Sequence, residues 1–354
     1  MDLVFDLEEV LYGNRVEFSD CAENSNDLSL LIDPLYFFGV GKRGGIHMAK
    51  QMAYFEGEFV PIEEASLNVM THAFNYGTAV FEGIRGNWNS THEELYLFKV
   101  QEHIERLVQS ARIIRMNGKY DVQEISRLVV ELAERCDYRE DIYIRPMVYK
   151  SGLDIGPAIH SVEDKLLLYV RPLGDYLDPE AGATVMTSSW RRVDDTSIPA
   201  RAKVSGLYVN NGLATSEAKQ NGMTEAIMLN QDGHVSEGAG ENLVMIRNGV
   251  LITPPPSDNI LEGITLDTAL FLAQEELGLT VERRTIDRSE LYIAEELFMT
   301  GTAAHVTPVT EVDRVEVGDG KPGPISRELQ KLFFNAITGE LDKYHGWLDS
   351  VYKK

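Results

Sequence analysis

A lysine in a small, apolar setting is the first residue able to do chemistry. Lys203 stands in IPARAKVSGLYVNN, beside Ala202, Val204, Ser205 and Gly206. Loss of water around such an amine lowers its pKa, and the neutral amine is then a nucleophile toward carbonyl groups. The alternative, which composition alone favours, is a surface lysine beside a turn.

Two further segments could hold a planar, anionic ligand. In HVSEGAGENL, Glu237 ends a hairpin strand, and the glycines after it allow a ring to approach, so its carboxylate could keep a ring nitrogen protonated. In LEGITLD, Gly263, Ile264 and Thr265 lead into an amphipathic helix, whose amides and dipole suit a phosphate. The alternatives are a surface acid before a bulge and an ordinary helix cap by Thr265.

Two segments could bind carboxylates. Tyr143 and Arg145 share one face of the alternating strand DIYIRPMVY, and an arginine there suggests bidentate carboxylate recognition, with a cross-strand ion pair as the alternative. In MTGTAAH, the successive amides of Thr302, Ala303 and Ala304 could form an anion-binding turn. A plain tight loop is the alternative there.

The elements that must position these residues follow from periodicity and turn signals. Apolar stripes predict two helices before residue 176, and Asp232-Gly233 and Asn248-Gly249 predict two hairpins after it. The expected elements are helices 102–116, 123–135, 207–220, 266–277 and 325–338, and strands 142–149, 165–171 and 184–190. We expect an α+β fold with an extension at 1–47, a small α/β domain at 48–175, a linker at 176–182 and a larger domain at 183–354.

Composition excludes several classes of function. The 354 residues carry a formal net charge of −23, which disfavours nucleic acid and membrane surfaces as partners, and the apolar runs are only strand-sized. Cys21 and Cys136 form no CxxC pair, the first residues are acidic, and we expect a cytoplasmic protein. The histidines lack metal-ligand spacing, so we expect no metal. Gly238-Ala239-Gly240 lacks the third glycine of a dinucleotide fingerprint and enters a strand, which argues against NAD.

Taken together and in order, the motifs resemble the branched-chain amino-acid aminotransferases of the fold-type IV pyridoxal-phosphate enzymes, in their bacterial form. The resemblance runs from about Tyr54 to the carboxyl end and includes FNYGTAVFEGIRG, YIRP, AKVSGLY, SEGAGENL, GITLD and MTGTAA. It implies a small α/β domain, a larger pseudo-barrel domain and the cofactor between them. AKVSGLY departs from many relatives at Ser205 and Leu207, and the redox CxxC of animal relatives is missing, so a thiol switch is not expected.

The resemblance also implies residue roles. Lys203 would form the aldimine with pyridoxal 5'-phosphate and carry the proton, Glu237 would pair with the pyridine nitrogen, and Tyr208 would bind the phenolic oxygen. Phosphate would be bound by Arg106, the amides of Gly263, Ile264 and Thr265, and Thr302. Arg106 lies opposite the apolar stripe of its helix, so its role rests on the resemblance alone. The substrate carboxylate would be bound by Tyr143, Arg145 and the Ala303 and Ala304 amides, and the side-chain pocket would be lined by Tyr76, Phe81, Tyr176 and Tyr208.

The expected activity is a ping-pong transamination between branched-chain L-amino acids (leucine, isoleucine, valine) and 2-oxoglutarate. Members of the family are homodimers, since the partner subunit completes the site, and some form hexamers. The alternatives of the same fold are D-amino-acid aminotransferase, (R)-amine transaminase and aminodeoxychorismate lyase. A catalytically silent relative that acts as a binding protein is the alternative from another class.

Overall fold

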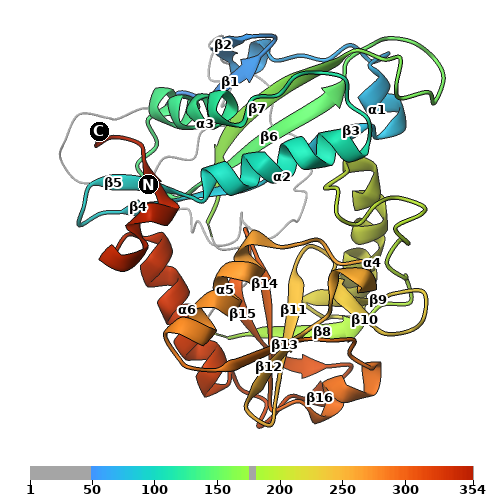
Figure 1. Cartoon of the computed structure of the whole chain (residues 1–354), viewed down its shortest axis with the longest axis vertical. Coiled ribbons are helices and arrows are strands. Elements are labelled where there is room, and N and C mark those ends of the chain that lie inside the picture. The colour runs from blue at the N-terminus through green and yellow to red at the C-terminus, as the bar shows by residue number, and fades with distance from the viewer. Residues whose placement is uncertain (1–48, 175–180, 354) are drawn as a thin grey trace, which may run out of the picture. The chain divides into compact units, whose positions relative to one another are not determined.

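The computed structural model describes residues 49–174 and 181–353. The predicted extension 1–47 lies outside the described residues, and so does the larger part of the predicted linker 176–182, including Tyr176. The described residues form two large sheets with helices packed against them (Figure 1).

The first sheet is antiparallel throughout and carries the Tyr143 and Arg145 segment near its centre. Its strand order is β17-β5-β4-β6-β7-β1-β2, with β3 paired to β6. The strands are β1 Met52–Phe55, β2 Glu58–Pro61, β3 Ala79–Phe81, β4 Ile84–Asn89, β5 Glu94–Phe98, β6 Ile142–Lys150, β7 Asp164–Pro172 and β17 Leu348–Ser350. The helices of this part are α1 His72–Tyr76, α2 Val100–Ile113 and α3 Val122–Cys136. Figure 1 shows α2 and α3 lying over β6 and β7.

Periodicity predicted α2 and α3 because each has one stripe that packs onto the sheet. In α3, the stripe of Ile125, Val129 and Leu132 is buried, and the Asp121 carboxylate caps the helix by accepting a hydrogen bond from the Glu124 amide at 2.8 Å. The expected helices 102–116 and 123–135 are therefore confirmed, with bounds shifted by one to three residues.

The second sheet curls into a half-barrel and mixes parallel with antiparallel pairs. Its strand order is β10-β9-β8-β15-β14-β11-β12-β13, with β16 paired to β15. The strands are β8 Ala183–Thr187, β9 Glu225–Leu229, β10 Val235–Gly238, β11 Asn242–Arg247, β12 Val250–Thr253, β13 Thr280–Arg283, β14 Glu296–Gly301, β15 His305–Val312 and β16 Val315–Glu316. Its helices are α4 Tyr208–Gln220, α5 Ile264–Glu275 and α6 Pro324–Ile337. The mixed helix and sheet class is confirmed.

Both predicted hairpins are present, as β9-β10 and β11-β12. Asn248 and Gly249 adopt φ of 52° and 70°, which is the positive region that tight hairpin turns require. Two elements of this part differ from expectation by two residues or more. The strand expected over 184–190 ends at Thr187, and the helix expected over 266–277 is Ile264–Glu275. The earlier start of α5 places the amides of the GIT segment in its first turn.

The Lys203 segment follows β8 along the chain but packs into the hydrophobic cluster of the first sheet. Ala202, Val204 and Leu207 are buried there with Val80 of β3 and Leu107 of α2. This packing places the lysine where residues of the two sheets meet. The division into two domains at 176–182 stays a prediction.

Candidate active site

The backbone of Lys203 is fixed on both sides. Its amide donates to Ser110 Oγ of α2 at 3.2 Å, its carbonyl accepts from the Phe81 amide at 3.0 Å, and Val204 forms a β-bridge with Val80. The ammonium nitrogen lies 5.4 Å from the centroid of the Phe81 ring and 5.5 Å from that of Tyr208. The lysine is therefore a positioned residue and not a surface lysine beside a turn.

The expected fall in the pKa of Lys203 is not what the structure gives. Burial lowers the pKa, but the Tyr208 phenol, which shares a hydrogen bond with the amine, and the Glu82 carboxylate outweigh that effect, so the pKa is raised. The prediction was wrong because it considered desolvation alone and left out Tyr208, which lies in the same segment, and Glu82, which is distant in sequence. The raised pKa keeps the amine in its charged form near neutral pH.

Arg106 is held by a buried carboxylate from the loop between β3 and β4. Arg106 Nε and Nη2 donate to the two oxygens of Glu82 at 2.7 and 2.8 Å, and His103 Nδ1 lies 2.8 Å from Glu82 Oε2. Glu82 is completely buried, and although burial raises its pKa, the Arg106 guanidinium and the contact with His103 hold the pKa well below its usual range. This pair fixes the orientation of the guanidinium.

The guanidinium reaches the start of α5. Arg106 Nη1 donates to the Glu262 carbonyl at 2.6 Å, and Gly263 follows as the N-cap without a side-chain cap. The amides of Ile264 and Thr265 thus lie in the first turn of a 12-residue helix, beside a positive charge. Capping by Thr265, the alternative considered above, is wrong because Thr265 lies inside the helix. A carboxamide occupies the space at Gly263, where an added Cβ would lie 1.9 Å from Asn242 Oδ1.

Glu237 is buried at the end of β10, as the sequence predicts, and is not a surface acid. Arg192 Nη2 lies 2.6 Å from Glu237 Oε1, while Asn242 Nδ2 and the Leu261 amide each donate to Glu237 Oε2 at 2.9 Å. Burial raises the pKa of Glu237, and Arg192 and the Leu261 amide oppose that rise. Asn242 also donates to the Leu261 carbonyl at 2.8 Å, so one amide joins this carboxylate to the start of α5.

Tyr143 and Arg145 lie together on β6, as alternation predicts. Arg145 Nη2 donates to Tyr143 Oη at 2.9 Å, and the guanidinium carbon lies 4.2 Å from the centroid of the Phe81 ring. No cross-strand ion pair of Arg145 is found among the described residues, so that alternative is not supported. Gly83 leaves room for the phenol, because a Cβ at this position would lie 2.2 Å from Tyr143 Oη.

The MTGTAAH segment forms the hairpin turn between β14 and β15. Thr302, Ala303 and Ala304 occupy the turn, and Thr307 Oγ1 donates to the Ala304 carbonyl at 2.6 Å. On β14, Thr300 pairs with Asn242 of β11, and the Thr300 hydroxyl is buried with no hydrogen-bond partner in the described part of the chain. A buried hydroxyl without a partner favours a polar group that binds here.

The predicted pocket residues divide into two groups. The rings of Phe81 and Tyr208 pack at 4.7 Å between centroids, next to Lys203. Tyr76 is 41% exposed, its ring packs on His72, and its hydroxyl accepts from the Gly156 amide at 3.1 Å. The described contacts therefore join Phe81 and Tyr208 to the lysine, and Tyr76 to the loop between β6 and β7.

Six residues of the site were missed from sequence: Glu82, Gly83, His103, Ser110, Arg192 and Asn242. A signal did exist on α2, where His103, Arg106 and Ser110 follow the spacing of one helix face, and His103 and Ser110 are buried beside the apolar stripe. A buried polar face on a helix requires partners, and these are Glu82 and the Lys203 amide.

The chain is similar to known proteins over most of its length. Residues 79–312 match the family described as amino-transferase class IV. The chain is 47% identical over 302 residues to a probable branched-chain-amino-acid aminotransferase of Aquifex aeolicus, covering 85% of this chain and 97% of that protein. It is 41% identical over 304 residues to the branched-chain-amino-acid aminotransferase of Escherichia coli K12, covering 84% and 96%.

Solved structures give the same result. A branched-chain aminotransferase of Thermoproteus uzoniensis with norvaline superposes with a TM-score of 0.82 at 40% identity, covering 86% of this chain and all of that one. The PLP form of a branched-chain amino acid aminotransferase from Thermobaculum terrenum also gives 0.82, at 38% identity, with 87% of this chain covered and all of that one. None of the described helices is long and apolar enough to cross a membrane. From its fold, its site and these matches, the chain belongs to the class IV aminotransferases.

Proposed function

We propose that this protein is a pyridoxal-phosphate-dependent transaminase that moves an amino group between branched-chain L-amino acids and 2-oxoglutarate by a ping-pong mechanism. The observation that carries the proposal is the arrangement around Lys203. Its amine lies against Phe81 and Tyr208, with a buried carboxylate on β10 and an arginine beside the start of α5.

The residues present fit the cofactor. Pyridoxal phosphate, when bound, supplies an aldehyde carbon that carries the amino group and a ring that takes up electrons. The carboxylate of Glu237 suits the ring nitrogen, the Tyr208 hydroxyl suits the phenolic oxygen, and Lys203 Nζ suits the attachment point. Arg106, Thr302 and the amides of Gly263, Ile264 and Thr265 suit the phosphate.

Lys203 is the residue we assign to proton transfer. The Tyr208 phenol and the Glu82 carboxylate stabilise the charged amine, so a proton can be held at Nζ and returned to the substrate carbon. The backbone contacts of Lys203 with Ser110 and Phe81 keep the chain in place while the side chain moves.

We assign recognition of the substrate carboxylate to Tyr143, Arg145 and the amides of Ala303 and Ala304. Arg145 bonds Tyr143 and stacks on Phe81, so its guanidinium is oriented before substrate binds. Arg145 Nε is buried without a partner among the described residues, which leaves a donor for an anionic group. Aromatic side chains of Tyr76, Phe81, Tyr176 and Tyr208 would line the apolar part of the pocket.

A homodimer is part of the proposal. Large apolar side chains on and near α1 are exposed, with 76% of Val69, 72% of Phe74 and 91% of Ile155 accessible. Apolar side chains gathered in this way mark an interface in a water-soluble enzyme. Tyr76 lies among them, so a second copy covering this face would bring a pocket residue to the partner's site. A sedimentation measurement of mass distinguishes a dimer from a hexamer built of such dimers.

Steady-state kinetics test the function. We expect transfer from L-leucine, L-isoleucine and L-valine to 2-oxoglutarate, with parallel double-reciprocal lines, and none from D-alanine or an (R)-amine. Lys203→Ala should abolish turnover, whereas Lys219→Ala, which changes an exposed lysine on α4, should not. Preference for D-alanine or the amine, or pyruvate release from aminodeoxychorismate, would replace this function with another of the fold. Activity retained by Lys203→Ala would refute it.

A further inference from the structure

Arg192 is buried behind the carboxylate that faces the proposed ring-nitrogen site. The side chains of Arg192 and Glu237 are only 3% and 6% exposed, and Nη2 lies 2.6 Å from Oε1. Arg192 follows β8, and its backbone amide donates to the Leu229 carbonyl of β9 at 2.8 Å. The ion pair thus lies within the half-barrel and is shielded from water.

The other donors of Arg192 bind two further segments. Nη1 donates to Asn211 Oδ1 at 2.8 Å, and Nε donates to the Asn259 carbonyl at 3.2 Å. Asn211 lies on α4, one turn after Tyr208, and its own amide donates to the Ala239 carbonyl just beyond Glu237. The Arg192 guanidinium therefore contacts both the Glu237 carboxylate on β10 and helix α4, which begins at Tyr208.

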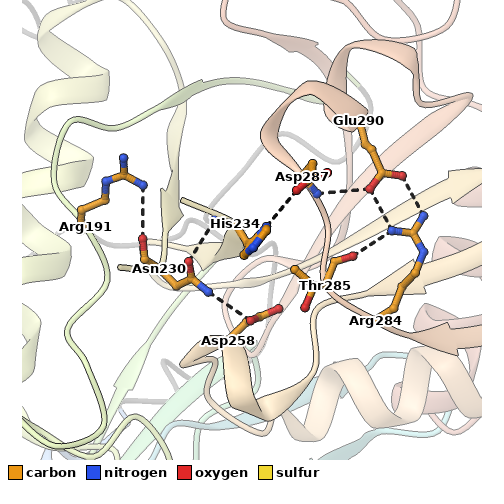
Figure 2. Close-up of polar contacts among 8 residues, drawn as sticks. All are labelled: Arg191, Asn230, His234, Asp258, Arg284, Thr285, Asp287 and Glu290. Carbon is orange, nitrogen blue, oxygen red and sulfur yellow. Dashed lines mark hydrogen bonds and ion pairs between the residues drawn. The ribbon is translucent and has the colours of Figure 1, made fainter. Parts of the chain in front are cut away.

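The acceptor of Nε is itself held in place. Asn259 adopts a positive φ of 62°, and its neighbour Asp258 accepts from Asn230 Nδ2 at 3.1 Å (Figure 2). Figure 2 also shows Arg191 donating to the Asn230 carbonyl. Adjacent arginines thus have different surroundings: Arg191 is exposed, and Arg192 is buried against Glu237.

Counting acceptor positions shows what remains for a ligand. A carboxylate offers about four lone-pair positions, two on each oxygen. Glu237 Oε2 accepts from Asn242 and the Leu261 amide, so both of its positions are used. Oε1 has only the ion pair with Arg192 among the described residues. A ring N–H must therefore bind the same oxygen that the guanidinium contacts.

We propose that Arg192 is the positioning residue that keeps Glu237 ionised, and so determines whether the proton between Glu237 and the cofactor resides on the ring nitrogen. A buried carboxylate without a counter-charge takes up a proton, and a neutral acid cannot stabilise a pyridinium. The inference rests on the proposed function, because it requires pyridoxal phosphate in the site. The charged groups that act on Glu237 are Arg192, Lys203 and Arg106, and Glu241 is the neighbouring acid.

The test is the ¹⁵N NMR shift of pyridoxal phosphate labelled at the ring nitrogen and bound to the full chain. We expect the shift of a protonated ring in the unmodified protein and in Arg191→Met, the matched control. In Arg192→Met, the shift should move toward the unprotonated value, with the ratio of protonated to unprotonated ring reduced by about ten-fold or more, equivalent to one pKa unit. Arg192→Gln, which loses the charge but keeps a hydrogen-bond donor, should move the same way.

A second measurement separates this role from a merely structural one. With a cofactor analogue that has carbon in place of the ring nitrogen, Arg192→Met should slow the half-reaction with L-leucine no more than Arg191→Met does. With pyridoxal phosphate, Arg192→Met should slow the half-reaction by at least about ten-fold, because the ring nitrogen then loses its proton. Equal losses with both cofactors, or an unchanged ¹⁵N shift in either neutral variant, would overturn the proposal. Failure of the unmodified protein to bind pyridoxal phosphate at all would instead remove the proposed function.

Discussion

Glu82 gives the sharpest prediction about stability, because its carboxylate has no exposed surface and bonds two cationic or potentially cationic side chains. Glu82→Gln keeps the volume but removes the charge and turns an amide donor toward Arg106 or His103. Exposed ion pairs contribute about 0–1 kcal/mol, whereas removing one member of a buried pair costs about 3–5 kcal/mol. Arg106 is 12% exposed and keeps the Glu262 carbonyl, so we expect the lower end, about 3 kcal/mol.

The assay is urea unfolding of the full chain at one protein concentration, which is fixed because self-association affects apparent stability. Glu105→Gln is the matched control, since Glu105 is on α2 and accepts from the exposed Gln101 and from no other described residue. We expect less than about 0.5 kcal/mol for this control, as for most surface substitutions. A loss below about 1 kcal/mol in Glu82→Gln would show that the buried pair does not hold Arg106 as described.

The difference in the free energy of unfolding between the protein and Glu82→Gln should depend on pH with a definite sign. The folded-state pKa of Glu82 lies below its unfolded value, near 4.5, so the stabilisation is fully present above that value. It is lost as pH falls from about 4.5 toward the lower folded-state pKa. The difference between the protein and Glu82→Gln should therefore be constant near neutral pH and shrink in acid. A difference that grows below pH 4.5 would contradict the assignment.

Three further predictions concern the Tyr143 contact, a buried acid and the proposed dimer interface. Gly83→Ala places a Cβ 2.2 Å from Tyr143 Oη and should displace the phenol. The KM for L-leucine should therefore rise by about ten-fold, roughly the 1.4 kcal/mol of one lost hydrogen bond, while cofactor affinity stays constant. An unchanged KM would contradict the contact between Gly83 and Tyr143. Burial and the nearby Glu225 raise the pKa of Glu241 to about 8, above its unfolded value, so the folded state loses stability as pH rises between 4.5 and 8. Glu241→Gln should therefore increase the urea midpoint above pH 8 and not below pH 4.5, and the reverse order would refute this. Ile155→Asp places a charge in the proposed interface and should shift the sedimenting mass toward that of the monomer. An unchanged mass would show that Ile155 does not lie in the dimer interface.

Much of the fold could be predicted because its signals are local. The stripe of Ile125, Val129 and Leu132 defines α3, and Asn248-Gly249 suits a turn that needs positive φ. Alternation placed Tyr143 and Arg145 on one face of β6, where they are bonded to each other. These features depend on residues that are close in sequence.

The rest of the site depends on pairs that are distant in sequence. Glu82 meets Arg106 across 24 positions, and Glu237 meets Arg192 across the whole of α4. Nothing in FEGIRG indicates that the acid points inward, and nothing in SSWRR separates a buried arginine from its exposed neighbour. Sequence distance explains only part of the wrong pKa direction for Lys203, because Glu82 is absent from its local sequence whereas Tyr208, the larger effect, stands in AKVSGLY.

The most direct test of the central claim is the visible absorption spectrum of the purified chain supplied with pyridoxal 5'-phosphate, before and after L-leucine is added. D-alanine and an (R)-amine are parallel controls, and Lys203→Ala shows which band depends on the lysine. The account predicts a band for the lysine-linked cofactor that only the L-amino acid converts to the pyridoxamine form. Conversion by D-alanine or the amine, or no band at all, would contradict it.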